Sequence, residues 1–223
     1  MKMAHPSFVS VLEWDALHPA SLVIEHPQTY LQVVSDLTAQ ENGGEGELVF
    51  SEKGQILSLQ KSALLIRDLW SVDVNQKKLL NGVLGSLKRI AREEYEAQVQ
   101  ELLLKMSGLL SNLMQDSMLP LLWEEQPDIT AVFKAMDVKL ESAHEPFDRL
   151  LDYVSLAHEY LHIKLVILVG VRAYLTSDEF SALCRDFAAQ ALPVLFVDGT
   201  DFPMVQGEKR LLIDADRCEL LLG

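Results

Sequence analysis

The sequence has little cysteine, few aromatic residues and no long apolar run. Its 223 residues include 2 cysteines, and 7% of the chain is aromatic. Cys184 stands alone in a helix-like pattern and Cys218 stands alone in a strand-like pattern. Single cysteines in such patterns are usually small buried side chains, so we expect neither a disulfide nor a cysteine metal site. No apolar stretch reaches the roughly 18–20 residues that span a bilayer, and the opening residues MKMAHPSF form no apolar signal segment. We therefore expect a cytoplasmic protein.

Basic residues are also scarce. Lysine and arginine number 19 against 33 aspartates and glutamates, which gives a net charge of −14. Because DNA phosphates must be met by cations, this balance argues against a nucleic-acid partner unless basic residues gather locally. They do gather, since residues 74–91 contain no acidic residue. We define the basic arc as the five basic residues of this segment and its end: Lys77, Lys78, Lys88, Arg89 and Arg92.

A phosphate-binding loop is also missing. The clearest strand–turn–helix unit is Lys164–Phe180, whose continuous apolar run is typical of a buried strand in an α/β sheet and whose Thr176 and Glu179 have capping-box spacing. Such turns often hold ligands. However, Gly170 is the single glycine of this unit, and nothing in it matches G-x-x-x-x-G-K-[ST]. We expect a central strand that binds no nucleotide.

The spacing of hydrophobic residues along the chain divides it into a part with strand-like spacing and a part with helical spacing. Strand patterns dominate the start, with a hairpin predicted around Glu52–Gly54, and helical periodicity then runs from about Lys61 to His162 before strands return. The chain is therefore predicted to be α/β, with a head domain of residues 1–60 and 154–223 and a mainly helical domain of residues 61–153. The other short strands are predicted at residues 8–12, 22–24, 138–141, 193–197, 211–213 and 219–222.

The helical part contains two amphipathic segments. Residues 77–92 place their apolar side chains on one side and the basic arc on the other, and a solvated lysine face is the ordinary alternative for such an arc. Residues 99–113 carry a near-heptad apolar stripe that can pair with another helix, in the chain or in a second copy. A scaffold that associates through this stripe and ignores DNA is a further possibility. Asp128 and Ser142 are predicted to cap the next two helices.

The residues His158, Glu159 and His162 spell H-E-x-x-H. On a helix this pattern can hold zinc with two imidazoles while the glutamate activates a water molecule, so a zinc-dependent hydrolase is the alternative function. Three features weigh against it. His158 falls in the apolar stripe of its helix, the helix must end at His162 because a buried strand follows, and any third ligand, such as Glu179 or Asp198, could be supplied only by folding.

Five segments, in order and at similar separations, carry a resemblance to a known family. They are ELVF (Glu47–Phe50), ALLIRDLWSVDVN (Ala63–Asn75), DITAVFKAMDVKLE (Asp128–Glu141), KLVILVGVRAYLTSDEF (Lys164–Phe180) and LPVLFVD (Leu192–Asp198). From about Phe8 to the C-terminus, the sequence resembles the short form of the CRISPR-associated type II-A spacer-acquisition protein.

This resemblance implies an ATPase-like head sheet without a phosphate-binding loop, carrying an inserted α-helical leg domain. It also implies a non-catalytic homotetrameric ring, supported by calcium, that holds ends of double-stranded DNA for CRISPR integrase and effector proteins during spacer acquisition (adaptation). Binding is expected to be independent of base sequence, because the chain offers charge for phosphates but no recognition helix or zinc finger.

The basic residues of the chain and the family resemblance together give two candidate sites, one for DNA and one for calcium. The candidate DNA contacts are the basic arc (Lys77, Lys78, Lys88, Arg89, Arg92) and the further residues Lys134, Lys139, Lys164 and Arg172. The resemblance implies calcium ligands in the acidic segment before the helix that starts near Ile129, namely Glu124, Glu125 and Asp128, whose hard oxygen atoms suit calcium. This chain has Leu121–Trp123 where relatives have more alternating acidic residues, and a helix cap with a solvated acidic turn is the ordinary alternative.

Overall fold

The structure of the protein is a computed structural model, and it describes residues 1–124 and 126–223. The chain forms two compact units. The larger unit consists of Met1–Asp73 and Ser142–Gly223, and the smaller unit is the single stretch Val74–Glu141. The protein is of mixed α/β class, as the sequence predicted.

A six-stranded sheet forms the centre of the larger unit. Its strand order is β10-β9-β3-β8-β7-β6, and every neighbouring pair is parallel except β9 with β10. The predicted apolar run forms the inner strand β7, whose five residues are all buried. The strands are β3 (Ala20–Ile24), β6 (Ala63–Ile66), β7 (Leu165–Val169), β8 (Val194–Asp198), β9 (Lys209–Ile213) and β10 (Glu219–Leu222).

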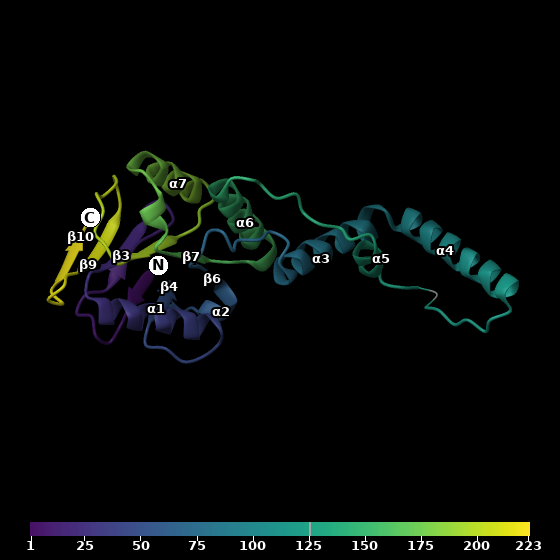
Figure 1. Cartoon of the computed structure of the whole chain (residues 1–223), viewed down its shortest axis with the longest axis horizontal. Helices are drawn as coiled ribbons and strands as arrows, with labels where there is room; N and C mark the ends of the chain where they lie inside the picture. The colour runs from purple at the N-terminus through teal and green to yellow at the C-terminus, as the bar shows by residue number, and fades with distance from the viewer. Residues whose placement is uncertain (125) are drawn as a thin grey trace. The chain divides into compact units, whose positions relative to one another are not determined.

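Helices cover both faces of this sheet (Figure 1). Helix α1 (Pro27–Glu41) packs Val33 and Leu37 into the core cluster that contains Leu165 and Ile167 of β7. Helix α7 (Ser177–Ala189) lies on the opposite side, where Phe180 meets Phe196 of β8 with ring centroids 4.6 Å apart. Because both faces are buried, the inner strands are continuously apolar.

A small antiparallel sheet joins the α1 side of the core. Its order is β2-β1-β4-β5, formed by β1 (Lys2–Ala4), β2 (Leu12–Glu13), β4 (Val49–Glu52) and β5 (Gln55–Ile56). The predicted hairpin is confirmed, with Gly54 at a φ of 80° in its turn. The strand predicted at residues 8–12 is wrong for residues 8–11, where the chain turns and the Phe8 N–H donates to the His5 carbonyl at 3.0 Å, and only Leu12 lies in a strand, as the first residue of β2.

The helical pattern predicted from Lys61 onward is wrong for Ala63–Ile66. Only α2 (Leu59–Ser62) is helical there, and the next four residues form β6, which pairs in parallel with β7. A four-residue apolar run cannot be assigned by periodicity, and the long-range pairing decides its conformation. The smaller unit therefore begins after this strand.

Two helix caps were predicted in the larger unit, and the structure confirms one of them. The capping box at the start of α7 is confirmed, since the Glu179 N–H donates to Thr176 Oγ1 at 3.3 Å and the Thr176 N–H donates to Glu179 Oε2 at 2.8 Å. The 3-10 helix η1 (Val171–Tyr174) precedes it. The predicted Ser142 cap is wrong, because α6 (Pro146–Leu161) starts after Glu145 and has no side-chain cap.

The smaller unit contains α3 (Lys77–Glu94), α4 (Glu96–Ser117) and α5 (Ile129–Ala135). Asp128 caps α5, as predicted. The strand predicted at residues 138–141 is wrong. The Asn75 side chain instead donates to the Leu140 carbonyl at 2.9 Å and accepts from the Leu140 N–H at 2.8 Å, so one amide takes the place of a neighbouring strand.

The two cysteines differ in their surroundings. Cys184 is buried as expected, and burial raises the pKa of its thiol to about 12, whereas Cys218 is exposed, contrary to expectation. None of the helices in the described residues is both long and apolar enough to cross a membrane.

Candidate nucleic-acid interface

Helix α3 presents the basic arc that the sequence predicted. Its apolar side is buried at Leu79, Val83 and Leu84. Lys77 and Lys78, in the first turn, are exposed. One amphipathic helix therefore turns its cations away from its packed side.

The members of the basic arc differ in their pairing. Lys88 is half-buried and forms an ion pair with Asp128, and Arg89 Nη1 lies 3.0 Å from Glu93 Oε2, one turn along the helix. No ion pair of the other three members is found within the part of the chain that the structure describes. Those three, Lys77, Lys78 and Arg92, carry the charge that is open to a phosphate group.

Asp128 links the predicted calcium ligands to the basic arc. Its Oδ1 accepts the Thr130 N–H at 3.0 Å, and its Oδ2 is paired with Lys88. The Lys88 ammonium, followed by the hydrogen bonds from Thr130, holds the pKa of this carboxyl well below its usual range. The residue is thus a charged helix cap, which is the ordinary alternative to a calcium ligand, and a calcium ion would have to displace Lys88.

The other two predicted calcium ligands give less information. Glu124 is exposed in the segment before α5, whereas Glu125 lies outside the described residues. The structure therefore shows one carboxylate that is engaged by the protein and one that is free to turn toward solvent. Calcium binding stays a prediction.

A cavity of about 430 Å³ lies where α3, α4 and the start of α5 meet. Arg92 of the basic arc lines it together with Glu96 and Asp128, so one cation and two carboxylates share this polar hollow. The remaining lining comes from Ala91, Val99, Gln100, Leu103, Gln126, Pro127 and Ile129.

Lys134 and Lys139 are exposed in the same unit. Lys139 Nζ lies 2.6 Å from Asp137 Oδ2 in an exposed pair, which is worth little and can be exchanged for another anion. The five residues of the basic arc and these two lysines make seven of the nine predicted contacts, and all seven belong to the smaller unit.

The two predicted DNA contacts in the larger unit differ in their exposure to solvent. Lys164 is exposed just before β7. Arg172 is only 3% exposed: its Nη2 donates to the Pro203 carbonyl, its guanidinium carbon lies 3.5 Å from the centroid of the Phe180 ring, and its Nη1 lies 3.8 Å from Glu208 Oε2. A buried guanidinium in this cluster cannot reach a phosphate, so we remove Arg172 from the candidate interface.

The H-E-x-x-H segment does not have the geometry that a zinc site on a helix requires. Helix α6 ends at Leu161, and His162 follows in the left-handed conformation with a φ of 56°. His158 is exposed rather than part of the core, which corrects that prediction, and its Nδ1 is 2.7 Å from the Ile163 carbonyl oxygen. The premise that both imidazoles project from one helix is therefore wrong.

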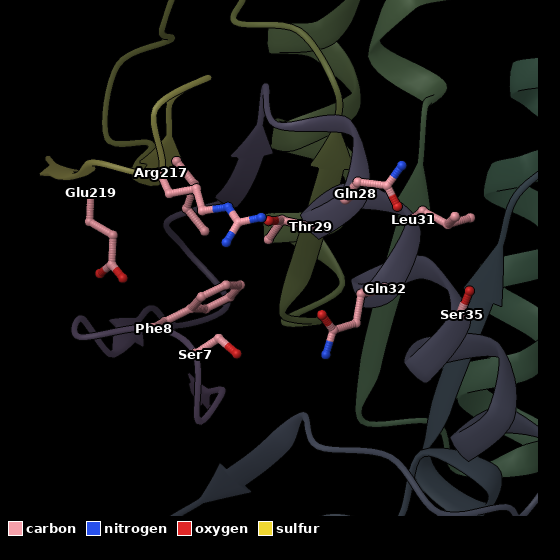
Figure 2. Close-up of a pocket in the computed structure, with 10 residues that line it drawn as sticks. Ser7, Phe8, Gln28, Thr29, Leu31, Gln32, Ser35, Arg217 and Glu219 are labelled. Atoms are coloured by element: carbon pink, nitrogen blue, oxygen red, sulfur yellow. The ribbon is translucent and has the colours of Figure 1, made fainter.

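A cavity of about 470 Å³ lies at the start of α1 and was not foreseen from the sequence. Figure 2 shows side chains from the N-terminal segment, α1 and the β9–β10 turn around it, with the Arg217 guanidinium directed toward α1. The strand-to-helix turn here is Glu25-His26-Pro27-Gln28, and His26 Nδ1 accepts the Thr29 N–H at 3.3 Å. This turn has no glycine, and its helix start is capped by the protein itself, so it does not form a phosphate-binding loop.

Sequence reasoning also missed a group of His5, Asp36 and Glu47, whose side chains come together beside the small sheet. No short motif marks it, because the three residues are far apart in the chain. Only the pairing of β1 with β4 brings the first and last of them near each other.

Comparison with known proteins shows one family. The model of the family described as CRISPR-associated protein (Cas_Csn2) matches residues 40–217. The CRISPR-associated protein Csn2 of Enterococcus faecalis is 24% identical over 182 residues, which cover 79% of this chain and 81% of that protein. The CRISPR-associated protein Csn2 of Streptococcus agalactiae is 25% identical over 180 residues, which cover 79% of this chain and 80% of that protein.

Proposed function

The chain belongs to the CRISPR-associated Csn2 family, and from this premise we propose that it binds double-stranded DNA ends, without catalysis and without base-sequence preference, as a homotetrameric ring during CRISPR spacer acquisition (adaptation) in a type II-A system. Family membership gives the CRISPR-associated role. The finer statements about DNA, the ring and the absence of catalysis belong to the proposal. The protein would work in the cytoplasm, together with CRISPR integrase and effector proteins.

The observation that carries the proposal is the exposed cationic surface of α3. The whole chain has a net charge of −14, so it should repel DNA on average. Lys77, Lys78 and Arg92 nevertheless stand on one side of one helix, and residues 74–91, which include both lysines, contain no acidic residue. Phosphate contacts of this kind give affinity without reading bases, which fits the absence of sequence preference in the proposal.

The apolar stripe of α4 supports self-association. Leu109 and Leu113 are exposed although they belong to this stripe, and Leu102 and Met106 are also more than one-third exposed. Exposed apolar rows of this kind are typical of surfaces that pack against another helix. We assign this stripe to the contact between copies in the proposed ring.

The sheet of the larger unit supports an ATPase-like head that has lost its nucleotide site. Five parallel strands carry helices on both faces, as in open α/β sheets that bind ligands at their carboxyl edge. The turn from β3 into α1 and the turn after β7 both lack the glycine-rich loop. In this proposal the smaller unit is the inserted leg, and calcium, if held by Glu124 and its neighbours, supports the ring.

The test measures both the number of copies in the assembly and its binding to duplex DNA. We expect light scattering of the purified chain to give four copies, with the tetramer favoured by calcium, and we expect a labelled linear duplex to bind with equal affinity for unrelated base sequences. A closed circular duplex should compete poorly, because a ring loads at an end. A monomer that ignores duplex DNA at about 50 mM salt would overturn the proposal.

A further inference from the structure

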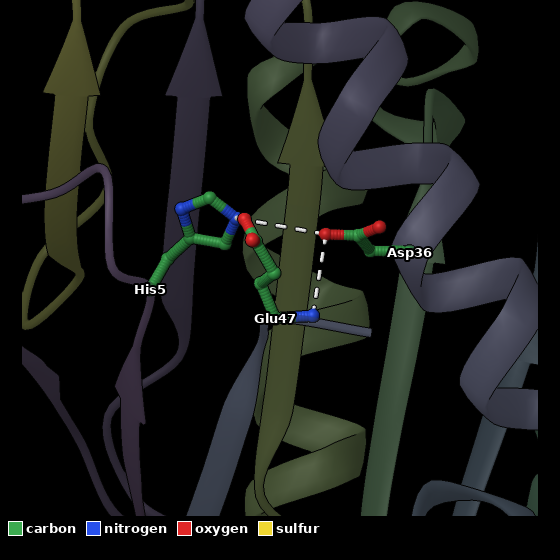
Figure 3. Close-up of side chains that lie close together, drawn as sticks. All are labelled: His5, Asp36 and Glu47. Carbon is green, nitrogen blue, oxygen red and sulfur yellow. Dashed lines mark hydrogen bonds and ion pairs between the residues drawn. The ribbon is translucent and has the colours of Figure 1, made fainter. Parts of the chain in front are cut away.

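Three side chains from separate segments meet beside the small sheet of the larger unit (Figure 3). His5 follows β1, Asp36 lies in α1, and Glu47 precedes β4. His5 Nε2 is 3.5 Å from Asp36 Oδ2 and 3.5 Å from Glu47 Oε2, and the three atoms all lie within 4.8 Å of one another.

The imidazole is the buried member of this group. The His5 side chain is 1% exposed, and its Nε2 is among the buried polar atoms for which the described residues supply no hydrogen bond. Its Nδ1 accepts the Ser7 N–H at 3.1 Å, and the Phe8 ring lies 4.7 Å from the imidazole ring. Separations of 3.5 Å are too long for good hydrogen bonds, so a buried nitrogen points at two carboxylates without being satisfied by either.

The carboxylates are held in place and can be reached from solvent. The Glu47 N–H donates to Asp36 Oδ2 at 3.4 Å, and Gln32 Nε2 donates to Glu47 Oε2 at 3.3 Å. The Asp36 side chain is 20% exposed and that of Glu47 is 55% exposed. An ion could enter from this side and meet the buried nitrogen behind the two oxygens.

The spacing fits metal ligands better than hydrogen-bond partners. Nitrogen and oxygen ligands lie about 2.0–2.2 Å from zinc, so two ligands of a tetrahedral site are about 3.4 Å apart. We propose that His5, Asp36 and Glu47 form a binding site for a divalent transition-metal cation such as zinc, with water in the remaining position. One imidazole and two carboxylates do not provide the 6–8 oxygen atoms that calcium takes, so this site is separate from the calcium prediction.

The hydrogen bond from the Ser7 N–H to His5 Nδ1 opposes metal binding at His5. Because Nδ1 accepts the Ser7 N–H, the neutral imidazole carries its proton on Nε2, the atom that would bind the metal. Binding therefore requires the proton to be on Nδ1 and the Ser7 N–H to turn away. This predicts a moderate affinity and makes the Ser7 amide a direct reporter of the bound state.

The bound cation would fasten three segments together. It would connect the N-terminal segment, α1 and the segment before β4, which otherwise meet through the small sheet and the core. A ligand that binds only the folded state stabilises it by mass action, so zinc at 100 times its dissociation constant should raise the melting temperature by about 5–10 °C. This inference does not depend on DNA binding, and either can fail without the other.

The experiment is a calorimetric titration of the dialysed full chain with zinc chloride, with calcium chloride as the comparison ion. We expect one zinc ion to bind per chain and the Ser7 amide resonance to shift in NMR spectra when it binds. The affinity for zinc should be at least tenfold lower in Glu47→Gln and in His5→Gln. Glu47→Gln is the decisive variant, because its exposed side chain can change without disturbing the core. Circular dichroism establishes that each variant is folded.

Two matched variants separate this site from other histidines. His18→Gln removes an exposed imidazole that is 2.8 Å from the Asp15 carboxylate, and His158→Gln disrupts the H-E-x-x-H segment. Both should bind zinc as the unchanged chain does. No zinc binding, equal zinc affinity in folded Glu47→Gln, or loss of zinc in His158→Gln alone would each overturn the proposal.

Discussion

The two units place their charges in opposite ways. In the larger unit, Arg172 and Arg210 are buried around Glu208, and Arg210 Nη2 lies 2.6 Å from Glu208 Oε1. In the smaller unit, Lys77 and Lys78 stand exposed on a helix whose other side is packed. Cations of the first kind hold a fold together, whereas cations of the second kind remain available to a partner. A positively charged side chain therefore has a different role in each unit, and its burial decides which role it has.

The apolar residues show the same contrast. The inner strands of the larger unit are buried on both faces, while α4 of the smaller unit has only Leu103 among its buried residues. In the proposed ring, packing against another copy would stabilise a unit with so much uncovered apolar surface. The larger unit should thus behave as a self-sufficient domain and the smaller unit as a binding and assembly module.

The largest effect is expected from removing the buried countercharge. Glu208→Gln keeps the shape of the side chain but leaves Arg172 and Arg210 without their shared carboxylate, so it should lower the free energy of unfolding by about 3 kcal/mol. Urea unfolding measures this loss. Lys2→Ala, which removes an exposed pair with Glu13, is the control and should cost less than about 1 kcal/mol. Equal effects of the two changes would contradict the contrast between buried and exposed charge.

Self-association should respond to one side of α4 only. Leu109→Glu places a charge on the apolar stripe and should weaken the contact between copies at least tenfold in sedimentation experiments. Leu104 is 73% exposed on the opposite side of the helix, so Leu104→Glu is the matched control and should leave assembly unchanged. If both variants stay assembled, the stripe is not the contact surface.

The pH dependence of stability tests another buried charge of the larger unit. Burial, opposed by the nearby Arg172 and Arg210, raises the pKa of Asp198 to about 7, whereas an unfolded aspartate titrates near pH 4. Between these values the folded state keeps a proton that the unfolded state loses, so stability falls as pH rises, by at most about 1.4 kcal/mol per pH unit, and levels off above pH 7. Asp198→Asn should remove this slope between pH 5 and 7. An unchanged slope in denaturation at several pH values would show that Asp198 does not titrate there.

The smallest effect is expected at the helix cap of the smaller unit. Asp128→Ala removes both the cap of α5 and the partner of Lys88, and should lower the melting temperature by about 2–4 °C. Glu101→Ala removes a carboxylate that pairs with Lys105 inside α4 but caps no helix, and it serves as the control. A drop no greater than that of the control would mean that the cap contributes nothing.

Features with a local cause could be predicted from the sequence. The strand β7, the capping box of Thr176 and Glu179, the cap at Asp128 and the amphipathic α3 all follow from neighbouring residues, and the structure confirms them. Each depends on hydrogen bonds or apolar spacing within one helix or strand. Such features need no knowledge of distant segments.

Features that depend on distant partners could not be predicted. Ala63–Ile66 becomes a strand because β7 lies beside it, and Leu140 needs no sheet because Asn75 satisfies its backbone. Arg172 is a candidate DNA contact in the sequence because it is basic, but Glu208 and Phe180 enclose it in three dimensions. The cluster of His5, Asp36 and Glu47 is likewise visible only after folding.

The most direct test of the account compares the salt dependence of duplex binding in two double variants. Lys77→Glu with Lys78→Glu reverses charge on α3, and Lys53→Glu with Lys61→Glu reverses the same charge on exposed lysines of the larger unit. The first variant should lose at least tenfold in affinity at about 100 mM salt, and its plot of log affinity against log salt should be shallower by about 2, while the second keeps a near-native slope. If reversal at Lys77 and Lys78 leaves both affinity and slope unchanged, these two exposed members of the basic arc do not contact DNA, which contradicts the account.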